Sequence, residues 1–242
     1  MKRTILGGPP KGLFSTIEVE ISTPCNLRCS TCPNSTHSRK PGVLPDETFR
    51  DLVDQLAAAR FQGSFSPHFY NEPLLDARLE EFLGLVRAKL PKATIPLFTN
   101  FTLMTPERYR ALAPLVDEFV VTLGQPEVDE AVQALRGELA PGEQGKLRTR
   151  SLGPGSLTNR AGAVELSEPV EPSSKTCDMV LSYMTVDAHG DVHLCCNDYF
   201  GKATFGNVKE ERLLDIWFSD KYQAARRAAY TKQHPLCRGC IW

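Results

Sequence analysis

The sequence lacks long apolar segments and a surplus of charge of either sign. None of its stretches approaches the ~18 uninterrupted apolar residues of a membrane-spanning helix, so we expect no membrane insertion. The opening MKRTILGGPPKGLF has no apolar run of secretory-signal length, which predicts a cytoplasmic protein. With 28 basic and 29 acidic residues the formal net charge is −1, which argues against a nucleic-acid partner.

Cysteine is absent from the whole stretch between Cys32 and Cys177, although the sequence contains eight cysteines. The eight therefore form two groups: Cys25, Cys29 and Cys32, then Cys177, Cys195, Cys196, Cys237 and Cys240. In a reducing cytosol, clustered cysteines bind metal or take part in chemistry more often than they form disulfides. The distribution predicts two separate metal centres.

Strand and helix patterns alternate before residue 140. Expected strands are 14–21, 65–70, 94–99 and 118–123, and expected helices are 44–59, 76–90 and 106–115. This rhythm is typical of βα units on a parallel sheet or partial barrel.

The pattern changes after residue 140. Residues 141–169 are rich in turn-forming residues and predict a linker or active-site loop. Residues 170–242 then contain an expected hairpin at 183–194 and an expected helix at 213–230. We therefore predict a first domain over 1–140 and a second, smaller one from residue 170.

Cys25, Cys29 and Cys32 lie on one short loop directly after an expected strand. Thiolates at C-x3-C-x2-C spacing can ligate three irons of a 4Fe–4S cube and leave the fourth iron open to a small molecule. The alternative is zinc, but zinc favours paired C-x2-C knuckles, and no second pair is near in the sequence. The spacing favours an open cluster.

This loop resembles the radical S-adenosylmethionine (SAM) family, whose motif is C-x3-C-x-aromatic-C, although Thr31 replaces the aromatic residue. The segment from His68 to Pro73 lies where the family has its G-E-P motif, with Asn71 in place of the usual glycine. Thr99-Asn100 lies where the family has its T-N-G motif, with Phe101 in place of the glycine. The resemblance implies that SAM is cleaved at the open iron. It also implies these SAM contacts: Tyr70, Asn71, Glu72, Pro73, Thr99 and Asn100.

The second cysteine group resembles the SPASM/twitch extensions of the same family, supported by the GNV and DIW segments. The resemblance implies one auxiliary 4Fe–4S cluster on Cys177, Cys195, Cys237 and Cys240. Cys196 is left over, and it could exchange roles with Cys195. From the residues alone, a structural zinc knuckle is the alternative. The implied fold is α/β, an abbreviated partial (β/α) barrel of the radical SAM type with a small C-terminal twitch domain.

From Phe14 to Cys240 the sequence is similar to the 2-deoxy-scyllo-inosamine dehydrogenase family of antibiotic biosynthesis. The resemblance implies oxidation of a secondary alcohol of an aminocyclitol or amino sugar to a ketone, with electron transfer to the auxiliary cluster. It implies flavodoxin or ferredoxin as the reductant. Arg160, in the loop Asn159-Arg160-Ala161-Gly162, matches the family's substrate-binding arginine and is otherwise a solvated loop residue.

Two alternatives stay open. The first is a radical SAM enzyme with another outcome: epimerisation, for which Cys196 could supply a hydrogen atom, dehydration, or peptide modification. The second is a non-catalytic binding protein stabilised by zinc or a cluster.

Overall fold

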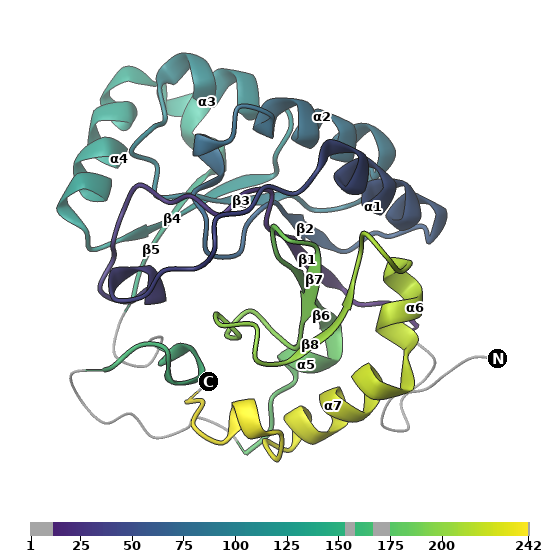
Figure 1. Ribbon diagram of the computed structural model, residues 1–242. Coiled ribbons are helices and arrows are strands. Elements are labelled where there is room, and N and C mark those ends of the chain that lie inside the picture. The colour runs from purple at the N-terminus through teal and green to yellow at the C-terminus, as the bar shows by residue number, and fades with distance from the viewer. Residues whose placement is uncertain (1–11, 153–157, 167–174, 242) are drawn as a thin grey trace.

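The computed structural model describes residues 12–152, 158–166 and 175–241 (Figure 1). Its strands are β1 Thr16–Val19, β2 Ser64–Ser66, β3 Pro96–Phe98, β4 Glu118–Leu123, β5 Leu147–Ser151, β6 Tyr183–Val186, β7 Asp191–His193 and β8 Thr204–Asn207. Its α-helices are α1 Asp46–Ala58, α2 Leu79–Lys89, α3 Pro106–Leu112, α4 Pro126–Glu138, α5 Met179–Ser182, α6 Leu213–Phe218 and α7 Asp220–Tyr230. Short 3₁₀ turns include η2 Pro73–Leu75, η5 Arg160–Gly162 and η6 Pro235–Cys237.

The described strands β6-β1-β2-β3-β4-β5 form one open, parallel barrel wall. β1 pairs in parallel with β2 and with β6, while β4 pairs in parallel with β3 and with β5. A parallel bridge between Ser64 and Thr94 connects the two sheets just before β3. The partial barrel expected from the sequence is confirmed.

Helices α1 to α4 lie along the outer side of this wall (Figure 1). They do so because each has an apolar stripe at helical spacing. On α1, for example, Phe49, Leu52, Val53 and Leu56 are buried, and the Phe49 ring stacks on Phe82 of α2 with ring centroids 4.0 Å apart. The inner side of the wall is therefore free to carry polar residues.

The C-terminal region extends the wall with an antiparallel meander, β6-β7-β8. The hairpin expected at 183–194 is confirmed, and the Asn207 amide donates to the His189 carbonyl at 3.1 Å and to the Asp191 carboxylate at 2.9 Å. The single helix expected at 213–230 is wrong. Ser219 adopts an extended backbone between α6 and α7, and its hydroxyl accepts from the Tyr222 N–H at 3.2 Å to cap α7.

The segment 141–169, expected to be a linker or loop, contains β5. Its sequence LRTRS has only one buried residue, so apolar alternation could not reveal it. β6 belongs both to the barrel wall and to the C-terminal meander, and the division of the chain at residues 140 and 170 stays a prediction. Within the described ranges, no helix has the length and apolarity to cross a membrane.

Candidate active site

A cavity of about 810 Å³ opens at the carboxyl ends of the barrel strands. This is the face on which βα barrels build their sites, and the volume is large enough for more than one small molecule. Nine of the residues predicted from the sequence line it: Cys25, Cys29, Cys32, Tyr70, Asn71, Glu72, Thr99, Asn100 and Arg160. Pro73 is not among the lining residues, and it instead begins the buried start of η2.

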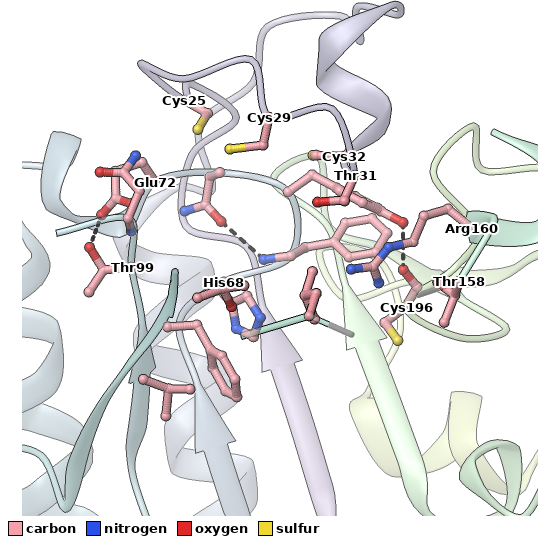
Figure 2. A pocket seen from close by; sticks show the side chains of 18 of the residues that line it. Cys25, Cys29, Thr31, Cys32, His68, Glu72, Thr99, Thr158, Arg160 and Cys196 are labelled. Carbon is pink, nitrogen blue, oxygen red and sulfur yellow. Dashed lines mark hydrogen bonds between the residues drawn. The ribbon is translucent and has the colours of Figure 1, made fainter. Parts of the chain in front are cut away.

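The first three cysteines are partly buried at the mouth of this cavity, where the sulfur atoms of Cys25 and Cys29 point into a common space (Figure 2). Burial, together with the neighbouring Cys32 and Cys25, raises the pKa of Cys29 to about 11. Three neighbouring thiolates repel one another unless a cationic centre holds them. The donor set therefore fits an iron–sulfur cluster.

A single metal ion fits these cysteines less well. In the described parts of the chain, no three His, Cys, Asp or Glu side chains come close enough together to hold one ion. In a 4Fe–4S cube each thiolate binds a different iron, so the three thiols need not converge on one point.

Glu72 ties the ends of two barrel strands together. Its carboxylate accepts from the Thr99 hydroxyl at 2.6 Å and from the Asn100 N–H at 2.6 Å, as Figure 2 shows for Thr99. A third bond, from the Leu74 N–H at 3.0 Å, caps η2. Burial raises the pKa of Glu72 against the effect of these hydrogen bonds. The side chain thus shapes the strand ends where SAM contacts were predicted.

Phe101, which stands where the family has glycine, has a φ of 68°. A side chain costs about 1–2 kcal/mol in this left-handed region. The Phe101 ring is fully buried against Phe119 and Tyr109, and this burial offsets the cost. Asn71 is not among the residues with positive φ, so glycine is not required there.

Arg160 reaches the cavity from a strained turn. Arg160 and Ala161 have φ values of 48° and 52°, and Gly162 follows at 89°. Such backbone strain clusters at functional sites. The Arg160 guanidinium donates to the Asn197 side-chain oxygen at 3.3 Å and lies over the Tyr70 ring at 5.9 Å. The Asn159 amide donates to the Gly239 carbonyl at 2.5 Å, which fixes the turn to the C-terminal segment.

Further ionisable residues line the cavity and were missed as site residues, among them Glu18, His68 and Arg150. Glu18 is 9% exposed. Burial raises its pKa to about 7, although the Arg160 charge opposes the shift. His68 Nε2 lies 3.9 Å from the Glu18 carboxylate, and burial lowers the pKa of His68 to about 3, so its ring is neutral.

A sequence signal for Glu18 did exist. In FSTIEVEI, Glu18 and Glu20 occupy the polar positions of an alternating strand, and alternation alone suggests that they face water. In a barrel strand covered by helices, those positions face the barrel interior. A carboxylate on the inward face of the first barrel strand is therefore a candidate site residue.

The second cysteine group converges from three parts of the chain. Cys177, Cys195 and Cys237 are buried and Cys240 is partly buried. Burial raises the pKa of Cys237 to about 11, with further contributions from Cys240 and Cys177. As at the first group, mutually repelling thiols fit a cationic cluster.

Cys196 lines the active-site cavity, whereas Cys177, Cys195, Cys237 and Cys240 are not among the lining residues. Its carbonyl accepts from the Tyr70 hydroxyl at 2.8 Å. This placement favours Cys195 over Cys196 as the ligand.

Comparisons with known proteins agree with this geometry. Residues 177–241 match the SPASM iron–sulfur cluster-binding domain. The S-adenosyl-L-methionine-dependent 2-deoxy-scyllo-inosamine dehydrogenase of Niallia circulans is 31% identical over 236 residues, covering 94% of this chain and 93% of the relative. The chain belongs to this family of radical SAM dehydrogenases.

Solved structures give the same result. The crystal structure of BtrN in complex with AdoMet and 2-DOIA matches with a TM-score of 0.84 and 30% identity, over 94% of this chain and 93% of that one. AdoMet-bound anSMEcpe matches with a TM-score of 0.63 at 14% identity, over 90% of this chain and 81% of that one, which shows a shared fold.

Family membership confirms the predicted enzyme class, a radical SAM oxidoreductase, and its cofactors, SAM and 4Fe–4S clusters. It also rules out the non-catalytic binding protein. The individual ligands and substrate contacts remain predictions that the geometry supports.

Proposed function

We propose that this enzyme oxidises a secondary alcohol of an aminocyclitol or amino sugar to a ketone, in antibiotic-type metabolism. The observation that carries the proposal is the position of Arg160. Its guanidinium lies in the cavity between the first cysteine loop and the segment of Cys195 and Cys196 (Figure 2). A substrate bound at Arg160 therefore lies between the two predicted cluster sites.

The first cysteine loop and the strand ends would hold the cofactors. The open cluster would be bound by Cys25, Cys29 and Cys32. The SAM beside it would be contacted by Tyr70, Asn71, Thr99 and Asn100. When bound, SAM and this cluster supply the radical that removes hydrogen from carbon, and the auxiliary cluster on Cys177, Cys195, Cys237 and Cys240 accepts the remaining electron. The guanidinium of Arg150, on β5 in the same cavity, is suited to the SAM carboxylate.

Arg160 and Glu18 would act on the substrate. The Arg160 guanidinium donates to the hydroxyl oxygen of the alcohol and holds the target carbon in reach. The Glu18 carboxylate takes the hydroxyl proton, because its pKa of about 7 lets it be a base at neutral pH. Neutral His68 is a hydrogen-bonding partner for the ring hydroxyls or amines of such a substrate.

A low-potential flavodoxin or ferredoxin would supply the electron for SAM cleavage in the cytoplasm. For the test in vitro, dithionite replaces it. Reconstituted enzyme should contain about eight irons per chain, four for each cube, and should convert members of an aminocyclitol panel to ketones with formation of 5′-deoxyadenosine.

The matched variants are R160K and R160Q. Both should keep iron content and SAM binding, while ketone formation falls by about 100-fold or more in R160Q, because a hydrogen-bond donor at the reacting oxygen is lost. The rate of ketone formation by R160K should lie between those of R160Q and wild type, because lysine keeps the positive charge but lacks the paired N–H donors of the guanidinium. Full ketone formation by R160Q would contradict the proposal.

A further inference from the structure

Cys196 is the only one of the eight cysteines that the two predicted clusters do not use. Its side chain lines the active-site cavity together with Glu18, Arg160 and Tyr183. Its Sγ lies 3.7 Å from the Met179 Sδ, and its carbonyl is held by the Tyr70 hydroxyl at 2.8 Å. The backbone that carries this thiol is therefore fixed at the wall of the cavity.

The same cavity contains polar groups that await a ligand. The side chain of Asn71 is buried, with the residue 9% exposed, and its Nδ2 has no hydrogen-bond partner among the described residues. The Arg160 guanidinium has no carboxylate within ion-pair distance in the described part of the chain, and it donates only to Asn197. Bound SAM would satisfy Asn71, and a polar substrate that satisfies the Arg160 guanidinium would lie beside Cys196 in the same cavity.

Cys196 and the first cysteine loop lie on different sides of the cavity. Figure 2 shows Cys25 and Cys29 at the upper left of the view and the Cys196 sulfur at the lower right, with the Arg160 side chain above that sulfur. A carbon held at Arg160 would thus present one face to the SAM side and the other toward the thiol. Hydrogen removed on one face and returned on the other inverts the carbon.

We propose that Cys196 is a hydrogen-atom donor that gives this site a second, redox-neutral outcome, inversion of the same secondary alcohol. The inference rests on the proposed function, because it uses the same substrate carbon. An S–H bond is weaker than the C–H bond of a carbinol carbon, so transfer of hydrogen from the thiol to the carbon radical is favourable.

The atoms and electrons balance as follows. The carbinol C–H bond breaks on the side that faces SAM. A new C–H bond then forms on the other face as the S–H bond of Cys196 breaks, and Cys196 becomes a thiyl radical. One electron from the low-potential reductant and one proton from water restore the thiol. The alcohol is neither oxidised nor reduced, and one SAM and two reductant electrons are consumed per inversion.

Thiol alkylation tests the placement without turnover. Burial raises the pKa of the Cys196 thiol, so labelling with iodoacetamide is carried out at alkaline pH. When both clusters are loaded, seven cysteines are ligands, and peptide mass spectrometry should find the label on Cys196 alone. SAM together with an aminocyclitol should protect it, and C196S should carry no label. Labelling of Cys195 in place of Cys196 would overturn the proposal, because Cys196 would then be a ligand.

Turnover in D₂O tests the chemistry. In wild type, the recovered alcohol should carry one deuterium at the carbinol carbon with inverted configuration. C196S is the matched variant, since its O–H bond is too strong to donate hydrogen. It should give no deuterated alcohol, and the ketone share of its products should rise.

Two results overturn the proposal. Ketone formation by wild type with no deuterium in the recovered alcohol would remove Cys196 as a donor and leave the proposed function standing. Failure of both wild type and C196S to make any ketone or deuterated alcohol across the panel would overturn the proposed function and this inference with it.

Discussion

The two cysteine groups of this protein differ in how they are built. The first is contiguous, with Cys25, Cys29 and Cys32 on a single loop, and it is partly exposed at the mouth of the cavity. The second is assembled from distant segments, with most of its thiols buried. One site is open to a small molecule, and the other is enclosed by protein.

This difference separates two tasks. A contiguous loop of three ligands leaves one iron available, which suits chemistry on a bound cofactor. If the four cysteines of the enclosed set hold a cluster, that cluster would join the segment before α5, the end of β7 and η6, so it would stabilise the structure as well as accept an electron. Variants at the two sites should therefore fail in different ways.

The largest effect is expected for C29A at the open site. SAM cleavage should fall to background, because the cube loses one of only three ligands. The fold should survive, since Cys29 is partly exposed and packs against no core. Iron content near four per chain with native circular dichroism would agree, whereas 5′-deoxyadenosine formation at the wild-type rate would contradict the open-site assignment.

C237A at the enclosed site should instead damage the structure first. The C-terminal segment loses the cluster that holds Cys177, Cys195 and Cys240 together, so residues 175–241 should become sensitive to proteolysis. Ketone formation should stop, while some 5′-deoxyadenosine is still made without coupling to product. Limited proteolysis and product analysis measure both, and coupled turnover in C237A would show that the second site is not the electron acceptor.

A smaller effect should appear in the pH profile of E18Q. Burial raises the pKa of Glu18 to about 7, so ketone formation by wild type should rise with pH up to about 7 and then level off. The titratable and charged groups near Glu18 include Arg160, His68, Tyr183 and Cys196, and Thr185 donates a hydrogen bond to it. His68 is neutral across this range because its pKa is about 3. E18Q should be slower by about tenfold or more and flat with pH.

Glu18 should also affect stability with a definite sign. Its folded-state pKa lies above the unfolded value, so its contribution to stability is present in acid and is lost as the pH rises from about 4 to about 7. E18Q should remove that loss, which denaturant unfolding at several pH values measures. An unchanged pH dependence of both turnover and stability would exclude Glu18 as the titrating group.

The smallest effect is expected for A161G, and F101G is its matched control. Both native residues have left-handed φ, but Phe101 is fully buried and Ala161 is not. A161G should change the free energy of unfolding by less than about 1 kcal/mol, because relief of strain and the entropy of glycine nearly cancel. F101G should lose about 2–3 kcal/mol as the cavity outweighs relieved strain, and equal effects in denaturant unfolding would contradict this account.

The sequence predicted the barrel and the open site because both depend on local patterns. Contiguous cysteines and strong helical periodicity, as in α1 and α2, are readable from spacing alone. β5 was missed because its residues are mostly exposed. Glu18 was missed because an alternating pattern does not distinguish a strand position that faces water from one that faces the interior of a barrel. The position of Cys196 depends on pairing between β1 and β6, which no local pattern contains.

The pairing of β1 with β6 also has a consequence for synthesis. Glu18 and Thr185 are neighbours across that pair although 167 residues separate them. On the ribosome, β1 and the first cysteine loop emerge early, yet this edge of β1 stays unpaired until β6 has been made. The nascent chain therefore carries an open strand edge beside three free thiols for most of its translation, which makes cluster insertion an event expected after the C-terminal strands have docked.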